Sequence, residues 1–139
     1  MDTVKLVYPV EGDDLIGAGE ASSQMKMVLK RMGFPGDVIR RASICMYEGE
    51  INMVIHADGG RAEVDVGVDN IVIRMIDQGP GIPDIDKAMQ EGWSTASEEA
   101  RVLGFGAGMG LPNMKKHSDE MRIDTVVGEG TTVTMVLKI

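Results

Sequence analysis

A carboxylate and an amide four residues apart are the first candidates for chemistry in this chain. Glu48 and Asn52 stand in a stretch that reads as a helix, so at 3.6 residues per turn they share one face. An amide oxygen suits Mg²⁺, which proteins hold through one or two oxygens together with substrate phosphates. A carboxylate one turn away can orient or deprotonate an attacking group. From this helix alone, the structural alternative is favoured: a pair satisfied by Arg41 or by loop backbone. Glu50 projects to the opposite side and is expected to be solvated.

A second candidate lies where an apolar strand is expected to end. Asp77 is followed by Gly79, Gly81 and Ile82, and an aspartate with glycines after a strand is also typical of any turn. In the functional interpretation, the carboxylate accepts a hydrogen bond from the amino group of adenine, and the glycines let the backbone approach the base. By itself this motif decides little.

A glycine-rich run directly before an expected helix is the most specific signal. Gly104, Gly106, Gly108 and Gly110 alternate with other residues, and exposed N–H groups at a helix N-terminus favour phosphate. The run is not a P-loop, because no Gly-Lys-Ser/Thr follows, and its spacing differs from the dinucleotide-binding fingerprint. A flexible hinge is the structural alternative. Ordering so many glycines costs much entropy, however, so the run favours phosphate binding.

Hydrophobic spacing and turn signals predict the elements that position these motifs. The stretch 77–108 has the irregular character of a lid or binding loop. The expected strands are 4–10, 62–68, 71–76, 121–127 and 131–137, and the expected helices are 19–32, 37–57, a short one at 84–90, and 110–116.

The order of these elements defines the expected fold class. Neighbouring strands joined by short turns are antiparallel, which excludes a doubly wound Rossmann domain. We expect an α+β fold, a two-layer sandwich with helices on one face of a mostly antiparallel mixed sheet. With 139 residues, the chain is expected to form one domain, 1–139, with a sizeable core. Twelve methionines indicate an adaptable core or contact surface, and the core is favoured.

Composition narrows the classes of function. A net charge of −8 argues against a nucleic-acid binder, which needs a basic stripe to neutralise phosphates. No apolar run approaches the roughly 18 residues of a membrane helix, and the start of the chain lacks a signal-peptide pattern. One cysteine excludes an internal disulfide, and two histidines disfavour a zinc site. We expect a cytoplasmic protein that contacts neither nucleic acid nor membrane.

The three motifs, in this order, resemble those of the Bergerat-fold (GHKL/HATPase) ATPase superfamily. Within it, the chain is most similar to the small anti-sigma-factor and switch-protein serine/threonine kinases of bacterial partner-switching systems. The likeness runs from about residue 37 to the C-terminus. The matching positions are Glu48, Asn52 and His56, then Asp77, Gly79, Gly81 and Ile82, then Gly106, Gly108, Gly110, Leu111 and Pro112, and finally Gly130, Thr131 and Thr132.

The resemblance implies an ATP- and Mg²⁺-dependent serine/threonine protein kinase that phosphorylates a small regulatory protein. Glu48 would be the general base and Asn52 the Mg²⁺ ligand, while Asp77 would bind adenine. The implied partner is an STAS-type antagonist or a sigma factor, and a homodimer through an edge strand or the first helix is compatible. The implied nucleotide-binding residues are Asn52, Asp77, Gly79, Gly81, Ile82, Gly104, Gly106, Gly108, Met109, Gly110, Leu111 and Thr132, with 93–107 as the lid.

Two other functions stay open. The first is a nucleotide-gated anti-sigma or regulatory binding protein without significant kinase turnover, in which ATP orders the lid and creates a docking surface. The second is a detached histidine-kinase catalytic domain, although the chain is too short to hold a dimerisation hairpin as well. Cys45 is expected to be a core residue and His56 a packed or capping one, while Trp93 either covers the nucleotide or docks a partner.

Overall fold

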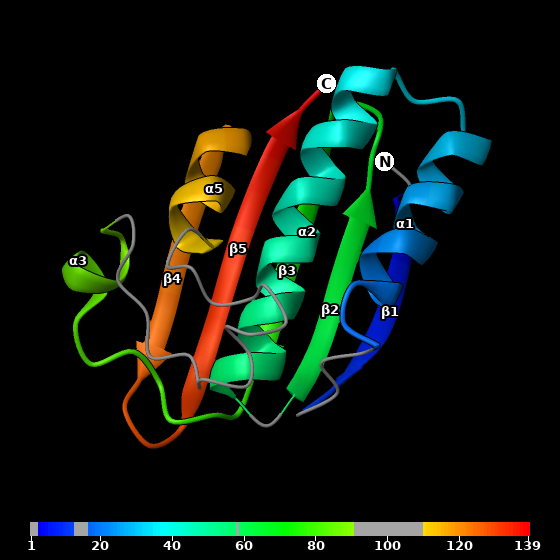
Figure 1. Cartoon of the computed structure of the whole chain (residues 1–139). Coiled ribbons are helices and arrows are strands. Elements are labelled where there is room, and N and C mark those ends of the chain that lie inside the picture. The colour runs from blue at the N-terminus through cyan, green and yellow to red at the C-terminus, as the bar shows by residue number, and fades with distance from the viewer. Residues whose placement is uncertain (1–2, 13–16, 58, 91–109) are drawn as a thin grey trace.

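The computed structural model describes residues 3–12, 17–57, 59–90 and 110–139. They form two layers, a five-stranded sheet and a layer of helices on one of its faces (Figure 1). The predicted two-layer α+β sandwich is therefore confirmed. The strands are β1 Val4–Glu11, β2 Gly59–Val66, β3 Asn70–Asp77, β4 Glu120–Val126 and β5 Gly130–Lys138; the helices are α1 Glu20–Arg31, α2 Gly36–His56, α3 Ile85–Ala88 and α5 Gly110–His117.

The sheet has the strand order β1-β2-β3-β5-β4, so β5 returns between β3 and β4. All four ladders between these strands are antiparallel. The central strand β3 ends at Asp77, which pairs with Gly60 of β2 and Thr131 of β5. Pro9 lies within the edge strand β1, opposite Arg61.

The core lies between the sheet and the helices. Alternate residues of β2 and β3 are buried, because successive side chains of a strand point to opposite faces. Methionine supplies much of the filling, as the composition indicated, since its flexible side chain fits irregular gaps. The buried methionines are Met25, Met46, Met53, Met75, Met114 and Met135.

The opposite face of the sheet carries ion pairs beside apolar residues such as Val7, Val72 and Ile76. Glu63 of β2 lies 3.4 Å from the Lys5 ammonium and 2.8 Å from the Arg61 guanidinium. The hydrogen bond from Arg61 is the main reason that the pKa of Glu63 is lowered. Arg74 pairs with Asp65 and also reaches Glu63 at 3.8 Å. This face therefore mixes ion pairs with apolar side chains.

A glycine in the middle of α2 sets how closely this helix approaches the sheet. Gly49 is buried, and a Cβ atom built on it would lie 2.5 Å from Cγ of Met75 on β3. A glycine inside a helix costs about 1 kcal/mol relative to alanine. Here it is needed because no side chain fits between α2 and β3.

Replacing this glycine tests the close approach. Gly49→Ala should have a free energy of unfolding about 1–3 kcal/mol lower than that of Gly36→Ala, because both gain the helix propensity of alanine but only the methyl group at position 49 overpacks the core against Met75. The measurement is urea denaturation followed by circular dichroism. Gly36→Ala is the matched control, since nothing lies within 4 Å of a Cβ atom there. Equal stability of the two variants would contradict this account of the packing.

Candidate functional site

The two residues first chosen from the sequence lie on α2, facing α5. Glu48 and Asn52 are both half-buried. Asn113 of α5 donates a hydrogen bond from Nδ2 to Oε1 of Glu48, at 3.3 Å. Asn113 was not among the predicted site residues. It stands three positions after Gly110, on the helix expected to follow the glycine-rich run, and that is the signal that could have found it.

Asn52 lies against the first residue of α5. A Cβ atom built on Gly110 would be 2.9 Å from Oδ1 of Asn52 and 3.1 Å from its Nδ2. Only a glycine lets this helix N-terminus come so close, and a helix N-terminus attracts anions. In the described part of the chain, no hydrogen bond is recorded for the Asn52 amide. The Asn52 side chain and the N-terminus of α5 thus lie directly against each other.

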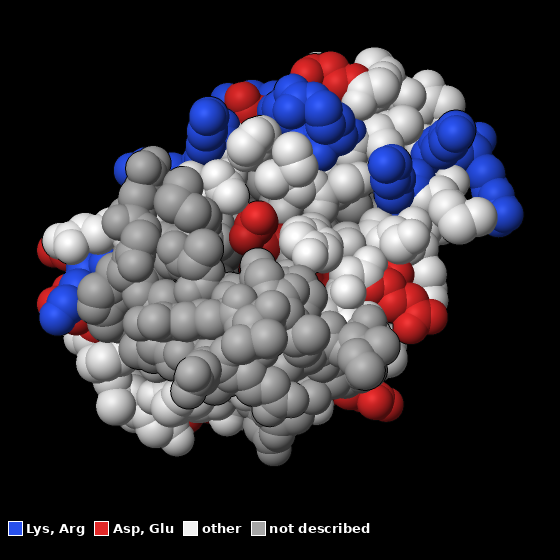
Figure 2. Space-filling view, in the orientation of Figure 1, with Lys and Arg blue, Asp and Glu red and all other residues white. Residues whose placement is uncertain are grey.

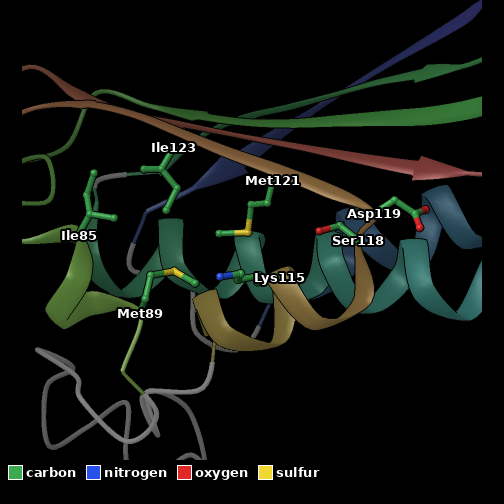
Figure 3. Close-up of a pocket in the computed structure, with 7 residues that line it drawn as sticks. All are labelled: Ile85, Met89, Lys115, Ser118, Asp119, Met121 and Ile123. Atoms are coloured by element: carbon green, nitrogen blue, oxygen red, sulfur yellow. The ribbon is translucent and has the colours of Figure 1, made fainter.

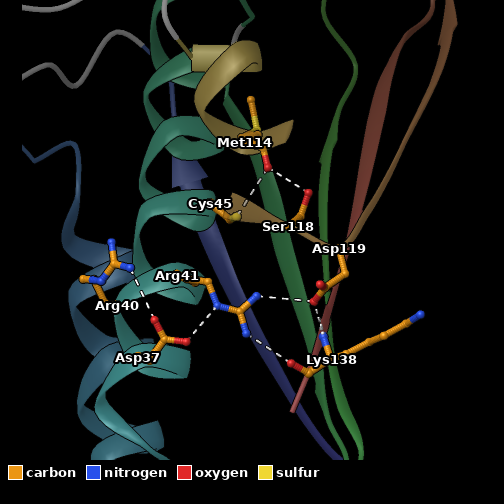
Figure 4. A network of polar contacts seen from close by, with 8 residues as sticks. All are labelled: Asp37, Arg40, Arg41, Cys45, Met114, Ser118, Asp119 and Lys138. Atoms are coloured by element: carbon orange, nitrogen blue, oxygen red, sulfur yellow. Dashed lines mark hydrogen bonds and ion pairs between the residues drawn. The ribbon is translucent and has the colours of Figure 1, made fainter. Parts of the chain in front are cut away.

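Arg41 does not satisfy Glu48, so the structural alternative based on this pair is wrong. The Arg41 guanidinium instead joins Asp37 and Asp119, each at 3.3 Å, and donates to the carbonyl oxygen of Lys138 at 3.1 Å (Figure 4). The backbone N–H of Lys138 donates to Asp119 at 2.6 Å. This hydrogen bond and Arg41 lower the pKa of Asp119. The network ties the first turns of α2 to the end of β5.

Glycines on both neighbouring strands, β2 and β5, lie against the backbone at the end of β3, where a side chain would not fit. Cβ atoms built on Gly60 and Gly130 would lie 2.1 and 2.2 Å from the carbonyl oxygens of Ile76 and Asp77. Oδ1 of Asp77 accepts a hydrogen bond from the N–H of Gly79 at 2.9 Å, while no partner for Oδ2 is recorded among the described residues. The recorded contact of the Asp77 carboxylate therefore uses one of its two oxygens.

Gly79 brings this turn against the end of α2. A Cβ atom on Gly79 would lie 2.6 Å from Cβ of Ala57, the C-cap of α2. Ala57 follows Asn52 by little more than one helical turn. The structure therefore brings Asp77 and Asn52 to the same end of the helix layer.

Gly81 and Ile82 lie against the end of β4. Gly81 has φ +79°, and a Cβ atom there would lie 2.7 Å from the carbonyl oxygen of Val126. The N–H of Ile82 donates to Oγ1 of Thr125 at 2.9 Å, and this hydroxyl lies 2.9 Å from Oγ1 of Thr131. The segment after Asp77 is thus fixed by a glycine conformation and a pair of hydroxyl groups.

The structure does not bring Thr132 to this site. Thr132 pairs with Ile76, and its side chain points to the sheet face away from the helices. Thr131 pairs with Asp77 and shares the helix-covered face with the buried residues Val133 and Met135. Counting back from those apolar residues in steps of two would have selected Thr131.

The remaining predicted residues divide into two groups. Leu111 is buried in the core, and Gly110 begins α5. The others lie outside the described residues: Gly104, Gly106, Gly108, Met109, Trp93 and the rest of the expected lid.

Glu50 is not solvated, and that prediction was wrong. Its side chain is 3% exposed. Its carboxylate accepts hydrogen bonds from the N–H groups of Gly19, Ala21 and Ser22 at 2.8, 3.1 and 3.0 Å. Gly19 is the N-cap of α1 and has no side chain to cap it. Glu50 therefore supplies the acceptor that every helix N-terminus needs.

Two further residues that invite chemistry are structural. Burial raises the pKa of the Cys45 thiol to about 12, so the reactive thiolate is scarce at neutral pH. Burial lowers the pKa of His56, so its imidazole is neutral near pH 7 and is not a cationic partner for phosphate. Both fit the expected packing roles.

A cavity of about 390 Å³ lies between α3, α5 and β4 (Figure 3). None of the predicted site residues lines it. It is therefore separate from the site formed by Glu48, Asn52 and Asp77. The lining residues are Ile85, Met89, Lys115, Ser118, Asp119, Met121 and Ile123.

Two searches of the described residues were negative. In ranges 3–12, 17–57, 59–90 and 110–139, no three His, Cys, Asp or Glu side chains gather as a metal site. Over the same ranges, no helix has the length and apolar character to cross a membrane.

Comparison with known proteins identifies the class to which this fold and site belong. Residues 38–139 match the family of histidine kinase-, DNA gyrase B- and HSP90-like ATPases. The chain is 34% identical over 113 residues to the serine/threonine-protein kinase RsbT of Bacillus subtilis, covering 78% of this chain and 79% of RsbT. It is 38% identical over 97 residues to an anti-sigma F factor of Caldanaerobacter subterraneus, covering 63% of this chain and 62% of that one. The chain belongs to this ATPase family.

Solved structures agree on the fold. The RsbU and RsbW domains of a Mycobacterium tuberculosis protein match with a TM-score of 0.65 and 20% identity, over 97% of this chain and 32% of that one. The mycobacterial sensor histidine kinase MprB matches with a TM-score of 0.53 and 16% identity, over 97% of each chain. The predicted superfamily is thus confirmed, and the predicted kinase class is the one that RsbT carries.

The role of Glu50 can be tested with two matched variants. Glu50→Gln should lower the free energy of unfolding by about 1–3 kcal/mol, because its amide nitrogen would face N–H donors and leave one unsatisfied. Glu48→Gln should change it by less than about 0.5 kcal/mol, because its oxygen can still accept from Asn113. Urea denaturation measures both. Equal losses would show that Glu50 does not hold α1 in this way.

Proposed function

We propose that the chain is an ATP- and Mg²⁺-dependent serine/threonine protein kinase acting on a small regulatory protein. The observation that carries the proposal is the meeting of Glu48 and Asn52 with the N-terminus of α5. A base, a metal ligand and an anion site are what phosphoryl transfer requires, because positioning and charge neutralisation supply most of its catalysis. RsbT, a relative of the same family, is named as a serine/threonine kinase.

Each residue has a proposed role. Glu48 takes the proton of the substrate hydroxyl, while Asn113 holds one of its oxygens in place. Asn52 would hold Mg²⁺ together with the phosphates, and the bound ion would supply neutralisation of the phosphate charge. Asp77 accepts from the adenine amino group, and Thr131 takes the place expected for Thr132.

The nucleotide contacts made by the turn after Asp77 and by the glycine run belong to the same proposal. Gly79, Gly81 and Ile82 line the base. We also propose one ATP-binding domain over 1–139, a cytoplasmic location, and an STAS-type antagonist or a sigma factor as the partner. The homodimer that the resemblance implies stays a prediction.

A regulatory binding role is the second candidate. Several relatives are named anti-sigma F factors, including one from Pasteuria penetrans that is 32% identical over 99 residues. Binding and phosphorylation can reside in one protein, so this role competes with the first only if turnover is absent. The likeness to MprB, at 16% identity, concerns the fold and gives no support to a histidine-kinase reaction.

The general base can be removed without removing its hydrogen bond. Glu48→Gln should lower the rate of phosphoryl transfer by about 10²–10⁴-fold, because the amide cannot take a proton. The measurement is acid-stable phosphoserine formed on a purified STAS-domain protein, with ATP binding followed by calorimetry. ATP affinity should not change. Full phosphorylation by the variant would remove Glu48 from its role, and acid-labile phosphate would point to a histidine.

The adenine contact can be tested by exchanging hydrogen-bond partners. Asp77→Asn keeps an oxygen for Gly79 but can place a donor where the adenine amino group must donate. ATP affinity should fall at least about tenfold, or 1.4 kcal/mol. ITP carries an acceptor oxygen in place of that amino group, so the variant should lose much less affinity for ITP. The affinities of wild type and Asp77→Asn for ATP and for ITP are measured by calorimetry. Equal losses of affinity for the two nucleotides would contradict a hydrogen bond between Asp77 and the adenine amino group.

A further inference from the structure

Charge is distributed unevenly over this acidic chain. The helices α1, α2 and α5 together hold seven of its fourteen Lys and Arg residues, but only four of its twenty-two Asp and Glu residues. One of those four acids is the buried Glu50. The helix layer is therefore cationic, while the rest of the chain carries the negative charge.

The cations gather at one end of the helix layer. α1 and α5 run antiparallel to α2, so both finish near the place where α2 begins (Figure 1). In Figure 2 most of the blue groups lie along the upper margin of this face, over these helix ends, with some red groups between them. We call this surface the basic end and define it by the exposed side chains of Lys26, Lys30, Arg31, Arg40 and Lys116.

Internal ion pairing does not account for the basic end. In the described part of the chain, no salt bridge is recorded for Lys26, Lys30, Arg31 or Lys116. Arg40 lies 3.3 Å from Asp37, but both side chains are mostly exposed, and such pairs contribute little. These charges are open to an external partner.

The helix dipole explains only part of the pattern. Cations in the last turn of a helix are favourable, which accounts for Lys30, Arg31 and Lys116. Arg40 lies in the second turn of α2, however, where the helix dipole gives a cation no stabilisation. Lys26 lies outside the last turn of α1. These two residues need another reason to be at this surface.

Exposed methionines lie beside the cations of α1. Met27 and Met32 are 53% and 44% exposed, and each directly follows a basic residue of the basic end. Methionine and arginine are enriched where proteins meet, and binding to a phosphate backbone has no use for exposed methionine. The mixture favours an acidic protein surface over a nucleic acid.

Distance sets the size of the occupant. Arg40 and Glu48 are eight residues apart on α2, which is about 12 Å along the axis. A molecule that contacts the basic end and also presents a hydroxyl group at Glu48 must span this distance. We propose that the basic end docks an acidic patch of the protein substrate and so holds its hydroxyl near Glu48. This inference rests on the kinase function proposed above.

Charge-reversed variants test the docking surface. Lys30→Glu/Lys116→Glu alters the basic end, and Lys5→Glu/Arg122→Glu makes the same charge change on the opposite sheet face. The probe is fluorescent poly-L-glutamate of about 20 residues at low salt, followed by anisotropy. Wild type and the control should bind it, with affinity that falls as salt rises. The first variant should bind at least about tenfold more weakly.

Three outcomes would overturn the proposal. They are no binding by wild type, equal weakening in both double variants, and tighter binding of a DNA duplex of equal charge, which would assign the surface to nucleic acid. Calorimetry with ATP on the same three proteins tests the kinase function separately from the docking surface. Unchanged ATP binding with lost peptide binding supports docking at a separate surface. Failure of all three proteins to bind ATP would defeat the kinase function without touching the peptide result.

Discussion

The hydrogen bonds of the Glu50 carboxylate are the contact on which the arrangement of the site depends. A buried carboxylate is costly unless it is fully satisfied, and the free N–H groups at the start of α1 satisfy it. The same contact caps a helix that begins with a glycine. Because Glu50 lies between Glu48 and Asn52 in the chain, holding it against α1 fixes the rotation of α2. This rotation turns the side chains of Glu48 and Asn52 toward α5.

Besides this contact with α1, the helix α2 makes a different kind of contact with each of its other neighbours. Gly49 allows close packing on Met75 of the sheet, while Arg41 joins the helix to the end of β5. At its last turns, Ala57 receives the glycine turn that follows Asp77. The proposed base, metal ligand and adenine contact therefore depend on one rigid helix. Displacing that helix would disturb all three together.

Much of this arrangement was readable in the sequence, and the misses have physical causes. Hydrophobic period and turn residues are local, so they predicted the element order and the shared face of Glu48 and Asn52. A projection of one helix cannot show that another helix begins against Glu50, so a buried capping residue was taken for a solvated one. Thr131 and Thr132 both fit the same short motif, and only the strand register distinguishes them. Asn113 matters through a contact between helices, which no local pattern reports.

In the described part of the chain, β1 and β4 are the edge strands of the sheet, and an unpaired edge is a template on which another strand can pair. The outer edge of β4 is protected by exposed charged residues, Glu120, Arg122 and Asp124. On β1 the protection is Pro9, which has no N–H to offer and interrupts the row of donors. A copy that added to β1 could not continue a ladder past this residue. Unlimited strand-by-strand growth into fibres is thus hindered at both margins by the backbone and surface chemistry of a few residues.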